Sequence, residues 1–339
     1  MQTSSIVSQH YAGRDGQRST KHVIACVDRS KHARKVVSHA LAIASALRVP
    51  VTLLQVLEAP PSSDFRLDPI EWDIRRHESQ NALKRLAVER ADRVEAINAE
   101  LAEGKAAEEI CRWARERSAE LIVLGTHGER EAEDFGIGDT ARDVLERAEV
   151  NVLLVPVFTV PIGTPHYRRM LVPLDGSSWS ESVLPLVVRL AHAADAELIL
   201  VYVVPVPELI ETDPLEAEDL DLRKRLIDRN ERVARSYLDR VRGYAAGQGL
   251  KVRALTLRGD DIRSSLTKFI DSEHVDLVVL SARGHGCRRV SDVPYGNVAR
   301  YLITHSPAPI LIVRPAGSPS KVYTAAKREA GRSPVRPLV

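Results

Sequence analysis

Short apolar runs alternate along the chain with longer segments whose apolar residues recur every three or four positions. The first such segment follows the run VIAC and places Ala33, Val37, Ala40 and Ala44 on one helical face. Runs that are apolar on both faces and alternate with helices are typical of a parallel sheet covered on both sides. The pattern therefore predicts an α/β protein with right-handed crossovers, that is, a doubly wound fold.

The same pattern occurs twice, in the same order. Each repeat opens with an apolar run that ends in an aspartate, Asp28 in the first repeat and Asp175 in the second. The best match is LIVLGTHG at 121–128 against LVVLSARG at 277–284. Matching strand segments are expected at 23–30 and 171–177, 51–57 and 197–204, 94–101 and 251–258, 121–128 and 277–284, and 152–156 and 310–315. Matching helices after the first pair are expected at 70–92 and 214–246, 106–118 and 260–273, and 140–148 and 296–305.

The first helix of the second repeat contains a proline that disagrees with its apolar pattern. An interior proline costs a helix about 3 kcal/mol, so Pro185 leaves two alternatives. Either the helix starts near Ser182, with the proline in its first turn, or it kinks there. Ser178 and Glu181 have the spacing of a capping box.

The repeats predict two domains, flanked by segments of a different composition. We expect a disordered segment at 1–20, a first domain at 21–156, a linker with three Pro/Gly residues at 157–166, a second domain at 167–315 and a disordered basic tail at 316–339. Although the whole chain has a net charge of +2, residues 21–315 carry −3 and the tail carries +4.

Composition and charge exclude several classes of function. A slightly acidic body with 4% aromatic residues is a poor nucleic-acid binder. The longest mostly apolar stretch has 11 residues and two prolines, whereas a membrane helix needs about 20, so no membrane partner is expected. Three separated cysteines, Cys26, Cys111 and Cys287, indicate free thiols and a cytoplasmic location. The sequence has no metal-binding spacing among its histidines, no nucleophile elbow and no Walker-type phosphate loop.

A ligand is expected beyond the carboxyl ends of the strands, where the strand order reverses. This places Asp28 beside the loop after Leu124, and Asp175 beside the loop after Leu280. Glycines in these loops allow backbone N–H groups to approach a phosphate at the start of the next helix. Each aspartate could accept hydrogen bonds from a sugar or base, or could cap the next helix, and these two roles are compatible.

The segments VPLDGS, VLGTHG and VLLVP resemble the universal stress protein family, and the resemblance covers residues 21–315. It implies two tandem domains, each a five-stranded parallel sheet in the order 3-2-1-4-5 with helices on both faces. ATP-binding members have a G-x2-G-x9-G-[ST] loop that holds the phosphates, and they place adenine near the first two strands. The resemblance implies site residues Leu174, Asp175, Val203, Leu280, Ser281, Gly284, Gly296, Asn297 and Val298 in the second domain, and Val27, Asp28, Val56, Leu124, Gly125, Gly128, Gly138, Asp139 and Thr140 in the first.

The first repeat keeps the glycine spacing but has the wrong charge. Gly125, Gly128 and Gly138 match the pattern, whereas Asp139 replaces the hydroxyl residue and Thr140 follows it. Residues 128–139 contain five carboxylates and one arginine. Because like charges repel, we expect the triphosphate site of this repeat to be degenerate, with the glycines kept for chain geometry.

The second repeat has a favourable loop charge but departs from the glycine spacing. Ser281 replaces the first glycine, and eleven residues instead of nine separate Gly284 from Gly296. Asn297 replaces the hydroxyl residue, but its amide can donate to a phosphate. Because Arg288 and Arg289 make this loop cationic, we expect nucleotide binding here rather than in the first repeat.

The resemblance implies a stress-response regulatory or interaction protein that binds ATP or another adenine nucleotide. One alternative is a slow ATPase or self-phosphorylating enzyme, for which no convincing general base is apparent. The other alternative is a nucleotide-free scaffold in which both sites have decayed. Protein partners are expected but not identifiable.

The implied strand order makes the fifth strand of each domain an apolar edge, which would promote aggregation if it were left open. We therefore expect 152–156 and 310–315 to pair antiparallel, so that the two domains form a pseudo-dimer within the chain. A further homodimer is compatible with this arrangement.

Overall fold

The computed structural model describes the following ranges of the chain: 21–59, 68–89, 96–128, 136–156, 165–207, 217–282 and 295–314. The predicted disordered ends and most of the predicted linker lie outside these ranges. Within them, strands and helices alternate twice, as the pattern predicts. The elements of the first repeat are β1 (Val23–Cys26), α1 (Ala33–Leu47), β2 (Val51–Leu57), α2 (Pro69–Val88), β3 (Ile97–Glu103), α3 (Ala106–Glu116), β4 (Leu121–Gly125), α4 (Asp139–Arg147) and β5 (Asn151–Val155).

The second repeat follows the same order, with one additional short helix. Its elements are β6 (Arg169–Pro173), α5 (Ser178–Glu181), α6 (Leu184–Ala194), β7 (Glu197–Pro205), α7 (Ala217–Gly247), β8 (Lys251–Gly259), α8 (Ile262–Ser272), β9 (Leu277–Ser281), α9 (Asn297–His305) and β10 (Ile310–Val313).

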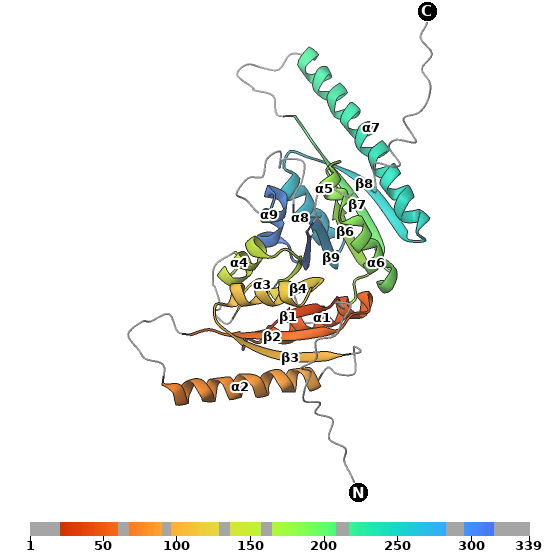
Figure 1. Ribbon diagram of the computed structural model, residues 1–339. Helices are drawn as coiled ribbons and strands as arrows, with labels where there is room; N and C mark the ends of the chain where they lie inside the picture. Colours follow the sequence, from red (N-terminus) through yellow and green to blue (C-terminus); the bar gives the residue numbers. More distant parts are fainter. Residues whose placement is uncertain are drawn as a thin grey trace, which may run out of the picture.

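All ten strands belong to one sheet, in the order β3-β2-β1-β4-β5-β10-β9-β6-β7-β8 (Figure 1). Each half is parallel and has the order 3-2-1-4-5, which confirms the expected fold class. The halves join through β5 and β10, which pair antiparallel with Leu311 opposite Leu153. The predicted edge pairing is therefore confirmed, and it turns two five-stranded sheets into one.

Helices cover both faces of this sheet, and each face has one apolar core that continues across both repeats. α1, α2, α6 and α7 pack on the first face, and α3, α4, α8 and α9 on the second. Successive strand residues point to opposite faces, so Leu153 and Leu311 belong to the first core while Val152 and Ile310 belong to the second. The two repeats therefore share their hydrophobic interior.

Two local expectations needed correction, and the structure confirms one of the two alternatives for the helix that contains the proline. β3 begins and ends a few residues later than the predicted strand 94–101, at Ile97 and Glu103. The helix with the proline starts at Leu184 with Pro185 in its first turn, so it does not kink there. Ser177, and not Ser178, caps α5 by accepting a hydrogen bond from the Ser180 amide at 3.1 Å.

A polar contact also links the repeats on the first face, beside a hydrogen bond within the first repeat. In that repeat the Lys35 ammonium donates to the carbonyl oxygen of Pro156 at 2.6 Å. His39 Nδ1 lies 2.7 Å from the hydroxyl of Tyr167, and both side chains are buried. Burial, helped by the charge of Lys35, lowers the pKa of His39 to about 4, so this imidazole is neutral at pH 7.

The two longest helices lie at the two ends of the sheet and are rich in charged residues. Within the part of the chain that the structure describes, no helix combines the length and apolarity needed to cross a bilayer.

Candidate functional site at the carboxyl ends of the strands

The aspartate after β1 forms a tight turn with the serine that follows it. Asp28 Oδ1 accepts hydrogen bonds from the Ser30 amide at 3.1 Å and from the Ser30 hydroxyl at 2.6 Å. α1 begins later, with His32 at its N-cap position and no side-chain cap. Asp28 therefore does not cap the next helix, and its role as a direct cap is excluded.

The second repeat builds the same turn. Asp175 Oδ1 accepts from the Ser177 amide at 2.9 Å and from the Ser177 hydroxyl at 2.6 Å. Here the serine in turn caps α5, so the carboxylate of Asp175 is linked to the helix through Ser177. Both aspartates thus have a carboxylate of fixed orientation at the carboxyl edge of the sheet, which is where a ligand was expected.

In the first repeat the structure brings this aspartate against the glycine loop. A Cβ atom on Gly128 would lie 2.9 Å from Asp28 Oδ2, closer than a real side chain allows. A Cβ on Gly125 would lie 3.0 Å from the carbonyl oxygen of His127, and one on Gly138 would lie 3.3 Å from that of Thr126. The close course of the backbone therefore favours glycine at Gly125 and Gly138 whether or not a ligand binds, whereas at Gly128 the close neighbour is the carboxylate of Asp28.

The base of the loop is closed by the same hydrogen bonds in both repeats. The Gly138 amide donates to the Thr126 carbonyl at 2.7 Å, and the Gly296 amide donates to the Ala282 carbonyl at 3.1 Å. The two extra residues of the second loop therefore leave its base unchanged. Gly284, Arg288, Arg289 and Cys287 lie outside the described residues, as do the acidic residues at 129–134.

The helices that start after these loops differ in charge. Gly138 and Gly296 are both extended N-cap residues without a side-chain cap. α4 then begins with Asp139, whose side chain is 94% exposed and pairs with Arg142 at 3.1 Å. α9 begins with Asn297, and its first turn has no acidic residue. A Cβ atom on Gly296 would have no described neighbour within 4 Å, and residues 283–294 of the preceding loop lie outside the described residues.

The apolar residues of the predicted sites are mostly core residues. Leu124, Val203 and Leu280 are buried in the second core, and Val56 and Val298 pack against it. Val27 and Leu174 are buried on the opposite face of the sheet, in the first core. The predicted site residues are therefore divided between the two faces of the sheet. Only those on the second face lie on the same side as the loops that follow β4 and β9.

Tyr202 is a residue near the site that the sequence analysis missed. It follows Val201 on β7, and burial, helped by the charge of Asp175, raises the pKa of its phenol. A Cβ on Gly176 would lie 3.9 Å from its ring. The corresponding residue of β2 is Gln55, so a comparison of the two repeats strand by strand could have identified the difference.

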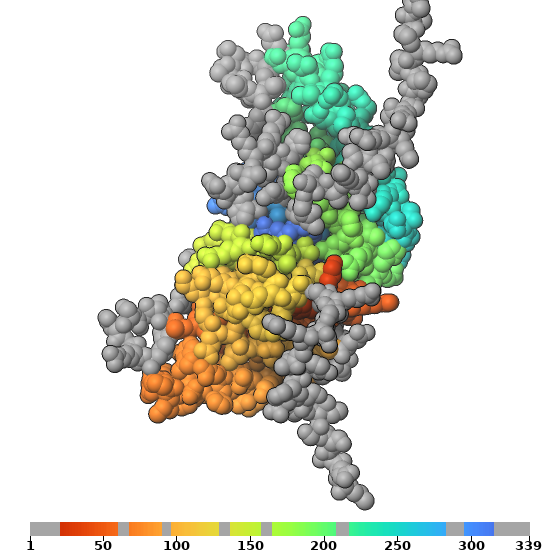
Figure 2. Space-filling model, in the orientation of Figure 1, coloured from red at the N-terminus to blue at the C-terminus, as the bar shows by residue number. Residues whose placement is uncertain are grey.

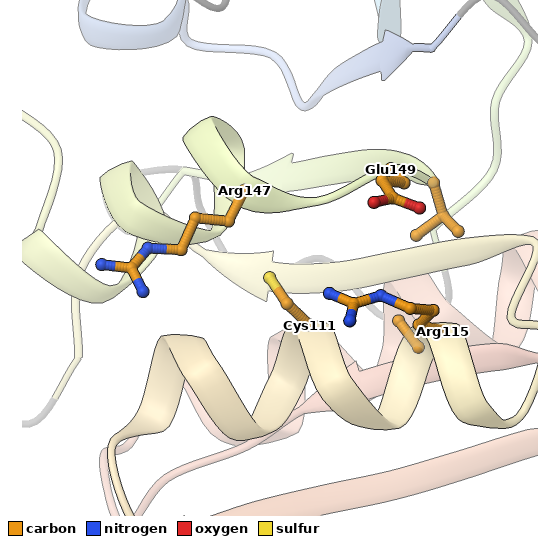
Figure 3. Close-up of a pocket in the computed structure, with 6 residues that line it drawn as sticks. Cys111, Arg115, Arg147 and Glu149 are labelled. Atoms are coloured by element: carbon orange, nitrogen blue, oxygen red, sulfur yellow. The ribbon is translucent and has the colours of Figure 1, made fainter. Parts of the chain in front are cut away.

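Two hollows in the described residues have none of the predicted site residues in their lining, although one of them adjoins the Asp28 turn through Arg29. One has a volume of about 40 Å³ and is lined by Cys111, Arg115, Arg147 and Glu149, among others (Figure 3). Burial raises the pKa of the Cys111 thiol although three arginines oppose the shift, so this group is a thiol at pH 7. The other, of about 280 Å³, lies between Arg29 and one side of α2. Ligand pockets usually have about 300–1,000 Å³, so neither hollow encloses a nucleotide.

The residues present could hold a phosphate in the second repeat. A helix N-terminus with no side-chain cap, an amide side chain and no carboxylate in the first turn suits an anion. Within the described residues no group of histidine, cysteine and carboxylate side chains could hold a metal ion.

Comparison with known proteins assigns both repeats to the same family. The model of the universal stress protein family matches residues 19–156 and 166–314. A universal stress protein of Methanocaldococcus jannaschii is 28% identical over 146 residues, which are 42% of this chain and 85% of that protein. The crystal structure of a universal stress protein from Archaeoglobus fulgidus aligns with a TM-score of 0.62 and 17% identity, over 88% of this chain and 97% of that one.

A Pseudomonas aeruginosa protein of unknown function has a similar structure. It aligns with a TM-score of 0.61 and 14% identity, over 91% of this chain and 98% of its own. Because the identities are only 17% and 14%, the two structures establish a shared fold and no more. Membership in the family rests on the family model. With both repeats matched along nearly their whole length, this chain belongs to the universal stress protein family and has two family domains in tandem.

Proposed function

We propose that this chain is a stress-response regulatory protein whose second repeat binds ATP or another adenine nucleotide. The observation that carries the proposal is the contrast between the two helix N-termini. α9 starts with Asn297 and has an acid-free first turn, whereas α4 starts with Asp139. ATP-binding members of the family hold the phosphates at this place.

The charge difference acts where the phosphates would lie. The first N–H groups of a helix have no partner within the helix and attract anions. On α9 they are supplemented by the amide of Asn297, which can donate a hydrogen bond. On α4 the carboxylate of Asp139 occupies the same position and repels a phosphate, although Arg142 offsets part of its charge.

The rest of the second site offers groups suited to a nucleoside. Asp175 has an orientation fixed by Ser177 and is placed to accept a hydrogen bond from a ribose or base. Val203 and Leu280 are core residues on the same side of the sheet as the loop, so they can form the apolar floor of a nucleoside site. A cytoplasmic location, consistent with the cysteine pattern, is part of this proposal.

A binding role is favoured over the two alternatives for different reasons. A slow ATPase or self-phosphorylating enzyme needs a group that activates water or a hydroxyl, and the sequence offers no convincing one. A nucleotide-free scaffold would have no need of an acid-free helix start in one repeat only. Single-turnover assays with labelled ATP test the first alternative: the proposal predicts bound ATP that is recovered intact.

The direct test of the second alternative is mass spectrometry of ligand released from the purified, acid-treated protein. The proposal predicts an adenine nucleotide in the wild type and its loss in Asp175→Ala. Protein that releases no nucleotide and does not bind added ATP would overturn the proposal.

A matched pair of variants then tests the charge argument. Asn297→Asp should weaken ATP binding by about two- to fivefold at low salt, because a charge at an exposed helix N-terminus contributes about 0.3–1 kcal/mol. Asp139→Asn, the reciprocal change in the first repeat, should leave the affinity of the second repeat unchanged. An equal loss of ATP affinity in both variants would show that the two helix N-termini do not differ in function.

A further inference from the structure

The second repeat has a cation beside the first turn of α9 that the first repeat lacks. Arg263 is the second residue of α8, which begins shortly after β8 ends. α8 and α9 pack against each other, and Figure 1 shows them side by side. In Figure 2 blue side chains of the range 295–314, which contains α9, are visible at the surface. Because both helices follow parallel strands, both begin at the edge of the sheet where a ligand was expected.

The guanidinium of Arg263 lies over the ring of Tyr301 on α9, with its central carbon 5.4 Å from the ring centroid. The ring of His305 stacks on the same tyrosine at 4.1 Å between centroids, which holds the tyrosine in place. Tyr301 follows Asn297 by four residues, so the two lie on one side of α9. Side chains of a helix tilt toward its N-terminus, so the guanidinium is held toward the Asn297 end of the helix.

Only the inner side of this guanidinium has a hydrogen-bond partner within the described residues. Arg263 Nε donates to Asp261 Oδ1 at 3.0 Å, and the same oxygen caps α8 by accepting from the Arg263 amide at 3.1 Å. The terminal nitrogens donate to none of the side chains or carbonyls that the structure describes, and the arginine side chain is 50% exposed. Asp261 therefore orients the fork and leaves its outer edge open to an anion, which arginine can bind through two hydrogen bonds.

The first repeat has no cation at the equivalent place. The second residue of α3 is Ala107, and the fifth residue of α4, which corresponds to Tyr301, is Asp143. Asp143 follows Asp139 by four residues, so two carboxylates lie along the side of α4 that corresponds to the side of α9 with Asn297. The contrast in charge between the repeats therefore extends from the first helix residue to the neighbouring helix.

We propose that Arg263 binds the phosphate chain of the nucleotide in the second repeat, and that it makes this repeat prefer ATP to adenosine. This inference rests on the proposed function and adds to it a residue of α8, outside the glycine loop. The arginine and Asn297 would approach the same phosphates from two helices. Hydrogen bonds between a guanidinium and a phosphate are strong and directional, so this contact distinguishes a nucleotide from a nucleoside.

Calorimetric titrations of the full-length protein with ATP and with adenosine test the proposal. Arg263→Ala should weaken ATP binding by about three- to tenfold and leave adenosine binding unchanged, because only ATP has phosphates. Arg263→Lys keeps the charge but not the planar fork, so it should recover part of the ATP affinity. The control Lys268→Ala removes an exposed cation further along the same helix and should change neither affinity. Equal losses for ATP and adenosine in Arg263→Ala would overturn the proposal.

Tripolyphosphate, which has phosphates but no nucleoside, separates failure of this inference from failure of the proposed function. Equal ATP affinity in Arg263→Ala and the wild type would overturn the role of Arg263 and leave the nucleotide site standing. A wild type that binds tripolyphosphate but not ATP, with weaker binding in Arg263→Ala, would overturn the nucleotide and support the phosphate contact. A wild type that binds neither would overturn both. Circular dichroism verifies that each variant is folded before it is compared.

Discussion

At the residue scale, Asp139 and Asn297 occupy the same position in the two repeats and differ by one charge. From the sequence alone, replacing Asp139 with serine would remove a repulsive carboxylate and supply a hydroxyl, a gain of roughly 10–150-fold in affinity for ATP. The structure lowers this expectation, since Asp139 is 94% exposed and already pairs with Arg142. Exposed pairs contribute only about 0–1 kcal/mol.

We therefore predict that Asp139→Ser raises the ATP affinity of the first repeat by no more than about fivefold. The measurement is a calorimetric titration in an Asp175→Ala background, so that only the first repeat can bind. The gain should vanish at high salt, because it removes an exposed charge. The control is Asp143→Ser, one turn further along α4. An equal gain from both variants, or none from Asp139→Ser at low salt, would show that charge at the helix start is not the obstacle.

A second residue-scale prediction concerns the buried pair of His39 and Tyr167. The pKa of His39 is lowered to about 4, whereas the unfolded value is near 6.5. A lowered pKa means that the unfolded state binds the proton more readily, so stability is lost as the pH falls from 6.5 through 4. The loss from this group is on the order of 3 kcal/mol at most.

Urea denaturation at pH 7, 5.5 and 4 measures this loss. His39→Gln keeps a group that can hydrogen-bond to Tyr167 but does not titrate. The variant should therefore lose less stability than the wild type over this pH range. If the free energy of unfolding falls equally with pH in the two proteins, His39 is not the source of the loss of stability.

At the element scale, β5 and β10 determine whether the chain forms one sheet or two. Leu311 is fully buried on β10 and lies opposite Leu153 of β5. We predict that Leu311→Ala lowers the free energy of unfolding by about 2–5 kcal/mol, as large-to-small changes in a core do. Val88→Ala, at a site that is 76% exposed, should change it by less than about 0.5 kcal/mol. Similar small effects in urea denaturation would mean that the seam between the repeats contributes little.

The elements that follow from strong apolar patterns were predictable, and the exceptions have physical reasons. VLLVP and ILIVRP are apolar at every strand position, so their pairing could be expected once the strand order was supplied. β3 was misplaced because INAELAE mixes three polar residues with four apolar ones and so lacks the continuous apolar run of the central strands, as an edge strand with one covered face does.

The candidate site was predictable in position but not in detail. The aspartates and glycine loops meet as expected because parallel strands end at one edge of the sheet. The contact of Asp139 with Arg142 has helical i,i+3 spacing and was predictable from the sequence, but Arg142 lies beyond the acidic span 128–139 on which the charge argument rests. Tyr202 was missed because it reaches Asp175 only through the pairing of β6 with β7.

At the scale of the whole molecule, each core runs through both repeats, so the repeats should unfold together. Trp113 lies in the first repeat and Trp179 in the second. We predict that single-tryptophan variants, with the other tryptophans changed to phenylalanine, give coincident fluorescence transitions in urea. Two separated transitions would show that the β5–β10 seam joins the repeats without coupling them.

The central claim is that the two repeats share a fold but only the second binds a nucleotide. A calorimetric titration with ATP on the wild type, Asp28→Ala and Asp175→Ala tests it most directly, because the two aspartates form the same turn in equivalent places. The account predicts one ATP per chain, binding that is retained in Asp28→Ala, and binding that is lost in Asp175→Ala. Loss in Asp28→Ala with retention in Asp175→Ala would contradict it, and would show that the glycine spacing of the first repeat outweighs its unfavourable charge.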